Sequence, residues 1–454
     1  MMKISGLKTI RPVFFVILII LFFASCSCYM KTDLGDESID VSITRKKDAA
    51  ENTGIILSFN KVSSVLDIPA ELQGMPVIKI VFADATNMSS LKNITIPDSV
   101  TEIDTFEKAS SLVAVNLPDN LAYMPSFKEC SKLTEIAIPA GVVEIPESCF
   151  EGCESLATIY KNGSSTDTTD TLEGIKAIGK RAFYNCKALS EIALESTEIT
   201  SLEELTFYGC SKLDTITLPD SVQKIDDQAF ESCIKLQTVK GFKNIKEIGK
   251  KVFYSCTSLE SIELNPEINK DEKQNENGET KITIKIPDNL FNGCEKLQSI
   301  IIPDGVTTLG TSVFANCKAL NELIIPEGIE IIPSNLCNGC LTLKSLSLPS
   351  TITKIDSSAI KDCNGLTKII CKAENPPLID ESNSLAAENL KNDLIIYVPD
   401  NSLDAYKDKA SWGEVFKFSD DTVEENPSEA EPSETSENTQ KKARILIKGL
   451  SEII

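Results

Sequence analysis

The chain has 454 residues, a formal net charge of −22 and no histidine. The absence of histidine excludes the Ser-His and Cys-His nucleophile pairs, and it removes the commonest general base and metal ligand. The acidic balance excludes nucleic-acid or anionic-lipid binding through net charge, and we interpret it as favouring solubility.

Residues 1–25 are predicted to be an export signal. Three basic residues precede an apolar run at residues 13 to 23, which is short for a membrane span of about 20 residues. The run ends in Phe23-Ala24-Ser25-Cys26, which resembles the lipobox of bacterial lipoproteins and is similar to its looser spirochaetal form. The resemblance implies cleavage before Cys26 and lipid attachment there; an ordinary signal peptide and an uncleaved anchor are the alternatives. Residues 26–54 are then expected to be an N-terminal tether.

An internal repeat fills most of the remaining sequence. Apolar residues recur at fixed offsets from a cysteine position that we call slot zero: Leu at offset 3, apolar residues at 6 and 8, Pro at 9, and apolar residues at 12, 15 and 20. Cysteine occupies slot zero at positions 130, 153, 186, 210, 233, 256, 294, 317, 340 and 363. Most intervals are 23 residues, and about 13 copies span residues 55–371.

Two longer intervals contain polar insertions near residues 161–171 and 265–281. Both follow the apolar segment at offsets 3 to 8, so both are expected on one edge of the repeat as mobile loops. A unit of about 23 residues cannot bury its own apolar face, so the units must stack. We therefore predict a leucine-rich-repeat solenoid: a curved rod with a concave parallel sheet and an irregular, 3-10 or short-helical convex side.

Three stretches, IPDSVTEI, LPDSVQKIDDQAFESC and IPDGVTTLGTSVFANC, resemble the BspA-like leucine-rich repeats of bacterial surface proteins. Residues 372–418 resemble the closing unit of that family. The resemblance implies an exported protein that adheres to host matrix proteins or to other bacteria. Its location would be the bacterial cell envelope, at the outer membrane and cell surface or on the periplasmic face.

The composition changes after residue 418. Residues 419–440 contain eight acids and no base, which indicates a disordered acidic linker. Residues 441–454 are a short tail that can form one amphipathic helix, and a frayed end is the alternative.

The regular cysteines invite three interpretations. Metal binding is disfavoured because zinc needs four converging ligands, and redox activity is disfavoured because the single C-x-x-C, Cys337 to Cys340, lacks a thioredoxin-type context. Disulfides are compatible with export, but Asn60, Met88 and Ala109 fill slot zero without a thiol. We therefore favour a reduced, buried ladder that serves packing.

Side chains at offsets 5 and 7 are expected to point out from the concave sheet. They are small and hydroxylated in the middle of the repeat and apolar near its C-terminal end. The candidate binding residues are Thr215, Thr217, Thr238, Lys240, Ser299, Ile301, Glu322, Ile324, Ser345 and Ser347.

The function predicted from these patterns is binding of a protein or glycan on a host or bacterial surface by a membrane-anchored lipoprotein. The alternatives are an envelope scaffold without a host ligand and, more remotely, a carboxylate-dependent hydrolase. No two outward glutamates fall on neighbouring coils, so paired-carboxylate catalysis is disfavoured. No catalytic residue, metal or cofactor is expected, and the oligomeric state is left open.

Overall fold

The computed structural model describes residues 28–34, 37–46, 54–72, 74–83, 85–162, 172–274, 280–383, 390–408, 410–416 and 444–453. These residues form two compact units. The first holds the described residues up to Thr200 together with Thr206–Leu213, and the second holds Ser201–Leu205 and the described residues from Asp214 onward. The expected signal peptide, Cys26, the expected acidic linker and most of the first insertion lie outside the described residues.

The first unit begins with a mixed sheet of order β1-β2-β3-β6-β5, and β8 pairs with β6. Its strands are β1 (Cys28–Leu34), β2 (Glu37–Lys46), β3 (Gly54–Lys61), β4 (Val65–Asp67), β5 (Glu71–Leu72), β6 (Met75–Phe82), β7 (Asn93–Thr95), β8 (Glu102–Ile103), β9 (Glu135–Ile138), β10 (Glu144–Ile145), β11 (Thr158–Lys161) and β12 (Ala177–Ile178), with a 3-10 helix at Ala85–Ser90. Within residues 26–54, for which the sequence predicts a tether, β1 and β2 form an antiparallel hairpin that extends this sheet through β3.

The second unit carries parallel ladders on its two walls. Its strands are β13 (Ser201–Leu202), β14 (Thr215–Thr217), β15 (Lys224–Ile225), β16 (Thr238–Lys240), β17 (Glu247–Ile248), β18 (Lys270–Gln274), β19 (Thr280–Ile286), β20 (Thr308–Leu309), β21 (Glu322–Ile324), β22 (Ile331–Ile332), β23 (Ser345–Leu348), β24 (Lys354–Ile355), β25 (Lys368–Cys371), β26 (Leu378–Ile379), β27 (Leu394–Val398) and β28 (Ile445–Gly449). Three 3-10 turns (Phe242–Asn244, Glu381–Asn383 and Asp400–Ser402), helices α2 (Leu403–Asp408) and α3 (Ala410–Phe416) and a final 3-10 turn (Leu450–Glu452) complete it.

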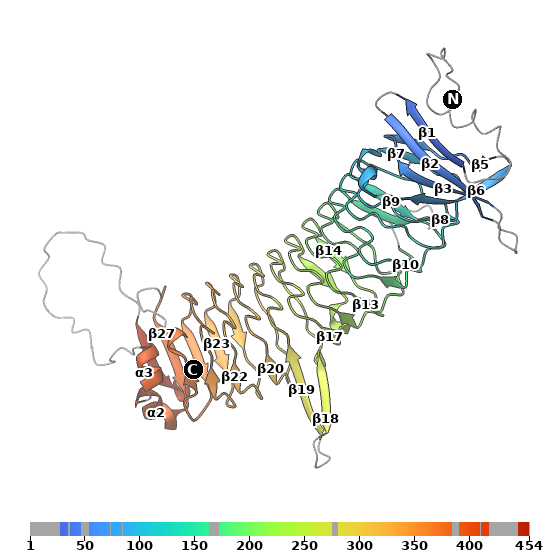
Figure 1. Cartoon of the computed structure of the whole chain (residues 1–454). Coiled ribbons are helices and arrows are strands. Elements are labelled where there is room, and N and C mark those ends of the chain that lie inside the picture. The colour runs from blue at the N-terminus through green and yellow to red at the C-terminus, as the bar shows by residue number, and fades with distance from the viewer. Residues whose placement is uncertain are drawn as a thin grey trace, which may run out of the picture. The chain divides into compact units, whose positions relative to one another are not determined.

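Coils in each unit stack one on the next, as Figure 1 shows. The segment at offsets 5 to 8 forms one parallel ladder, for example β14 with β16. Offsets 14 and 15 form a second ladder of two-residue strands, for example β22 with β24. Each coil therefore supplies hydrogen bonds on two walls, and the leucine-rich-repeat solenoid predicted from the sequence is confirmed.

Phenylalanines three residues before slot zero stack through the core of each unit. In the first unit the rings of Phe127, Phe150 and Phe183 follow at centroid separations of 5.8 and 5.5 Å with nearly parallel planes. In the second unit Phe253 and Phe291 lie 5.8 Å apart. All five side chains are buried. In the second unit the stack ends at Phe314, because Cys337 and Ile360 take this position on the next two coils.

Two further expectations need correction. The insertion near residues 265–281 is not simply a mobile loop, because β18 and β19 pair as an antiparallel hairpin and β19 continues into the solenoid through the buried Ile286. The tail is not a helix, because β28 forms a parallel ladder with β27. Its alternating burial, with Ile445 and Ile447 inward, is the period of a strand.

Candidate binding surfaces

The slot-zero cysteines donate hydrogen bonds between coils. Cys153 Sγ lies 3.0 Å from the carbonyl oxygen of Phe127, and Cys317 Sγ lies 3.2 Å from that of Phe291, each on the preceding coil. The same contact recurs at Cys130, Cys186, Cys210, Cys256, Cys294 and Cys340. Burial raises the pKa of the thiol in Cys130, to about 12, and also in Cys153, Cys186, Cys256, Cys294, Cys317 and Cys340, which disfavours the reactive thiolate. The ladder is therefore a structural device.

The outward residues of the second unit form two registered columns, which we call the strand face. Offset 5 places Glu322, Ser345, Lys368, Ile395 and Leu446 on neighbouring strands. Offset 7 places Ile324, Ser347, Ile370, Tyr397 and Lys448 beside them. Ser299 and Ile301 occupy the same offsets on the coil before β21, outside any named strand.

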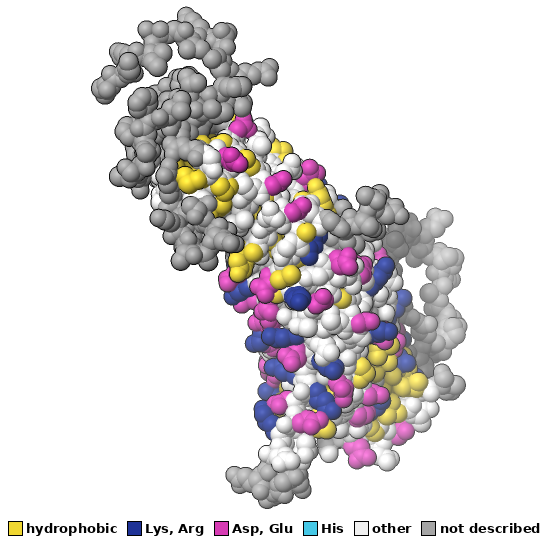
Figure 2. Space-filling view, turned by 90° about the vertical axis from the view of Figure 1, so that its right-hand side faces the viewer, with side chains coloured by type: hydrophobic (Ala, Val, Ile, Leu, Met, Phe, Trp, Pro, Cys, Tyr) yellow, Lys and Arg dark blue, Asp and Glu magenta, His cyan; other side chains and the backbone are white. Residues whose placement is uncertain are grey.

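Apolar side chains are exposed at the start of the strand face. Ile301 is 83% exposed and Ile324 is 55% exposed, whereas Ile300 and Leu323, the inward neighbours, are buried. Further along the offset-7 column, Ile370 and Tyr397 are half-buried. The offset-7 column is therefore mainly apolar, with Ser347 between Ile324 and Ile370 and Lys448 at its end. Figure 2 shows hydrophobic side chains gathered in patches among mixed charges on one side of the molecule.

Two groups of candidate residues lie in separate places. Thr215 pairs with Thr238, and Thr217 pairs with Lys240, on β14 and β16. Glu322, Ile324, Ser345 and Ser347 lie on β21 and β23. Ser347 lies on the expected face of the sheet but is only 9% exposed. Its short side chain lies between Ile324 and Ile370 in the register, and the two longer side chains shield it.

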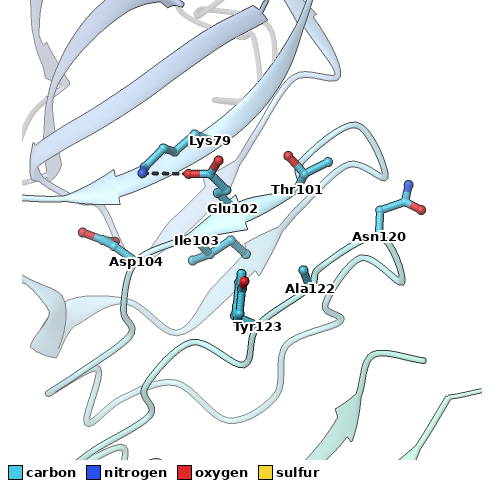
Figure 3. Close-up of a pocket in the computed structure, with 8 residues that line it drawn as sticks. All are labelled: Lys79, Thr101, Glu102, Ile103, Asp104, Asn120, Ala122 and Tyr123. Carbon is cyan, nitrogen blue, oxygen red and sulfur yellow. Dashed lines mark hydrogen bonds and ion pairs between the residues drawn. The ribbon is translucent and has the colours of Figure 1, made fainter. Parts of the chain in front are cut away.

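A depression of about 530 Å³ lies in the first unit. Its lining is Lys79, Thr101, Glu102, Ile103, Asp104, Asn120, Ala122 and Tyr123, which Figure 3 shows. Lys79 Nζ lies 2.8 Å from Glu102 Oε2, and the Asp104 carboxylate accepts the backbone N–H groups of Phe82 and Thr105. Burial raises the pKa of Asp104. These polar groups bond within the protein, so the depression defines no ligand class.

Metal-ligand clusters and membrane-spanning helices were both sought among the residues that the structure describes. Within those ranges, histidine, cysteine, aspartate and glutamate do not gather in groups of three that would hold a metal ion. None of the helices in the described part of the chain combines the length and apolar composition that a membrane crossing requires. The lipid-attachment residue expected from the sequence, Cys26, lies outside the described residues.

Stacked coils of about 23 residues with buried leucines and parallel ladders define a leucine-rich-repeat solenoid. The chain belongs to the family of the BspA type leucine rich repeat region, whose model in six copies matches residues 79–171, 160–275 and 279–390.

Solved structures of bacterial leucine-rich-repeat proteins resemble this chain. A leucine-rich repeat protein from Bacteroides ovatus is 24% identical over 74% of this chain and 94% of its own, with a TM-score of 0.48. A leucine rich cell surface protein from Faecalibacterium prausnitzii is 23% identical over 86% and 98%, with a TM-score of 0.45. The pneumococcal vaccine antigen PcpA is 16% identical over 84% and 96%, with a TM-score of 0.43. A search of curated proteins found no match.

Proposed function

We propose that this protein is an exported lipoprotein, anchored through Cys26, that binds a protein or glycan on a host or bacterial surface through the strand face of its second unit. The observation that carries the proposal is the exposure of Ile301 and Ile324 on an open sheet. Family membership supports the export and binding parts, because the resemblance to BspA-like proteins implies surface adhesion. The protein acts without catalysis in this proposal.

Exposed isoleucines on a strand also have a simpler explanation, because β-branched residues suit strands wherever they lie. Two features favour contact with a partner. The apolar positions continue in one column through Ile370 and Tyr397 rather than being scattered. Ser299, Glu322 and Lys368 run alongside as a polar border, the arrangement typical of an interface with an apolar centre and a polar rim.

Replacing Ile301 and Ile324 together by Asp tests the strand face. Capture of matrix proteins or of bacterial cells by the soluble chain 27–454 should fall at least about tenfold, because two carboxylates would have to be desolvated at the contact. The matched control replaces Ile234 and Leu341, which are 45% and 41% exposed outside the face, by Asp. Unchanged capture by a folded face variant would remove this surface from consideration.

Absence of any captured ligand, with the protein still at the envelope, would favour the scaffold alternative. Hydrolysis of a surface glycan that Glu322→Gln abolishes would favour the hydrolase.

The anchor is tested separately. Cells expressing the full chain should incorporate a palmitate analogue into the protein, and Cys26→Ala should abolish the label. Unchanged labelling of that variant would refute attachment at Cys26. Protease treatment of intact cells then distinguishes the outer surface, where the protein is cleaved, from the periplasmic face, where it is protected.

A further inference from the structure

The last strand of the second unit does not belong to a repeat coil. β28 joins β27 as the fifth strand of the sheet β21-β23-β25-β27-β28. The chain leaves α3 at Phe416 and is described again from Arg444, so residues 417–443 connect the body of the unit to its closing strand. Ordinary coils reach the next strand after about 23 residues through the second wall. β28 is instead a docked segment on the open edge of β27.

An acidic residue holds the start of the docked strand. Asp393 Oδ1 accepts the backbone N–H of Arg444 at 2.7 Å, and Asp393 Oδ2 lies 3.0 Å from Arg444 Nη2. The N–H of Leu394 donates to the carbonyl of Arg444 at 2.8 Å, which sets the register. The first residue of the segment is therefore selected by charge as well as by backbone pairing.

The far end of the strand is held by the side-chain carboxylate of Asp400. Ser451 Oγ donates to Asp400 Oδ1 at 2.7 Å, and a Cβ at Gly449 would overlap the same oxygen. Between the two clamps Ile445 and Ile447 are buried. The edge of β27 and Asp400 thus recognise a short pattern: an arginine, two alternating isoleucines and a serine. Strand addition to a sheet edge is a recurring mode of peptide recognition.

Every contact of the closing strand is non-covalent, and the same contacts form when another copy supplies the strand. Residues 417–443 can extend to roughly 95 Å at ~3.5 Å per residue, which is ample to reach a neighbouring molecule. We propose that residues 444–452 are an exchangeable closing strand, and that a second copy of this chain is the partner that the edge of β27 accepts. In the resulting pair each chain closes the sheet of the other.

Charge reversal tests the exchange with full mature chains. Asp393→Arg and Arg444→Asp each set like charges against each other within one chain, whereas mixing the two variants restores opposite charges only between chains. Light scattering should show single-chain mass for each variant alone and twice that mass for the mixture. The matched control is Glu295→Lys with Lys318→Glu, an ion pair of 2.7 Å with 46% and 43% exposed side chains, and its mixture should stay at single-chain mass.

A mixture that remains at single-chain mass, with both variants folded by circular dichroism, overturns the proposal. If either variant unfolds, a second measurement decides. Ile447→Asp in the full chain places a carboxylate at a buried position, so it should expel its own strand and leave the edge of β27 vacant. A labelled peptide of residues 441–453 should bind that variant at least about tenfold more tightly than the wild-type chain, in which the tethered strand competes. Failure to bind, or equal binding of a peptide that carries Ile447→Asp, overturns the proposal.

Discussion

At the scale of single residues, the slot-zero thiol has a more specific role than its sequence pattern suggests. Asn60, Met88 and Ala109 share the slot, which favours a packing interpretation. The structure adds a direction: eight of these thiols point at a phenylalanine carbonyl of the preceding coil, and Cys363 points at the carbonyl of Cys337 instead. The phenylalanine carbonyl also accepts the backbone N–H of the cysteine on its own coil, as Phe127 does from Cys130. The thiol supplies a second hydrogen bond where water is excluded.

Substitution of Cys256 separates the two interpretations. Cys256 Sγ lies 3.1 Å from the carbonyl oxygen of Phe230. Alanine should lower the free energy of unfolding by about 1–2 kcal/mol, because it loses the donor and some volume. Serine keeps a donor and should cost less than alanine in denaturant titrations. If serine costs more than alanine, packing alone explains the slot.

A second residue-scale prediction concerns pH. Arg181 Nη2 lies 2.8 Å from Glu151 Oε1, and this contact lowers the pKa of Glu151 from its ordinary 4.5 to about 2. Because the folded pKa lies below the unfolded one, the pair stabilises the fold above about pH 4.5, and this stability is lost as pH falls toward 2.

Glu151→Gln should therefore reduce stability at neutral pH and flatten its decline between pH 4.5 and 2, as followed by circular dichroism. The control is Glu154→Gln, which breaks the half-exposed pair with Lys187 and should change the profile little. A profile for Glu151→Gln that parallels the wild type would contradict the prediction.

At the scale of elements, the larger insertion interrupts the second wall, and one side chain repairs it. Asn269 lies beside β17, at the place where the next strand of the second wall would otherwise pair with it. Its Oδ1 accepts the N–H of Ile248, and its Nδ2 donates to the carbonyls of Ile248 and Lys285. The amide thereby imitates a strand backbone. Asn383 makes similar contacts at the last coil. Its Oδ1 accepts the N–H of Ile360, and its Nδ2 donates to the carbonyl of Asp356.

Asn269→Ala should lower the free energy of unfolding by about 1–3 kcal/mol, because the N–H and carbonyl of Ile248 lose their partners. Chemical denaturation measures the change. Asn244→Ala is the matched control, since it removes only an exposed hydrogen bond to Asp220 and should cost little. Equal losses in the two variants would show that Asn269 is not a substitute for the ladder.

Element-scale prediction from the sequence was uneven for physical reasons. The strands at offsets 5 to 8 are visible because they alternate in polarity, but the two-residue strands of the second wall are too short to alternate. The turns are not visible in the sequence either. Positive φ recurs at two positions of the coil, one residue and five residues before slot zero. The residues there include Lys108, Arg181 and Leu205 as well as glycine and asparagine. Because the stacked coils impose this conformation, no single residue type is required at these positions, and the sequence carries no consistent signal of the turn.

At the scale of the whole molecule, the fold of the repeated part could be predicted from the sequence, whereas the structure of the unique ends could not. Each coil repeats the same apolar offsets, so one register fixes about 13 copies. The tail contains one apolar alternation, Ile445 and Ile447, that also fits an amphipathic helix. The tail forms a strand and not a helix because the open edge of β27 pairs with it. The local sequence of the tail carries no signal of that edge. Among the candidate site residues, exposure was predictable for Ile301 and Ile324, whereas the shielding of Ser347 depended on its neighbours across the sheet.

We predict that the cysteine ladder is reduced throughout the chain. Thirteen described cysteines are buried, and burial raises the pKa of the thiol in Cys130 and Cys371 alike. With Cys26 and Cys28 replaced by serine, the native protein should not react with a thiol reagent at pH 8, and all thirteen should react in denaturant without reductant. A count that rises only after reduction would reveal disulfides instead.

The contact between a thiol and the coil before it has a consequence for how such proteins change over generations. Each coil satisfies its hydrogen bonds and its ring stacking with a neighbour built to the same plan. A gene duplication or deletion of one coil therefore leaves every remaining coil with suitable neighbours, and the length of the array can drift without redesign. The unique pieces at the C-terminal end, Asn383 and the strand β28, are inherited once and mark where the series stops.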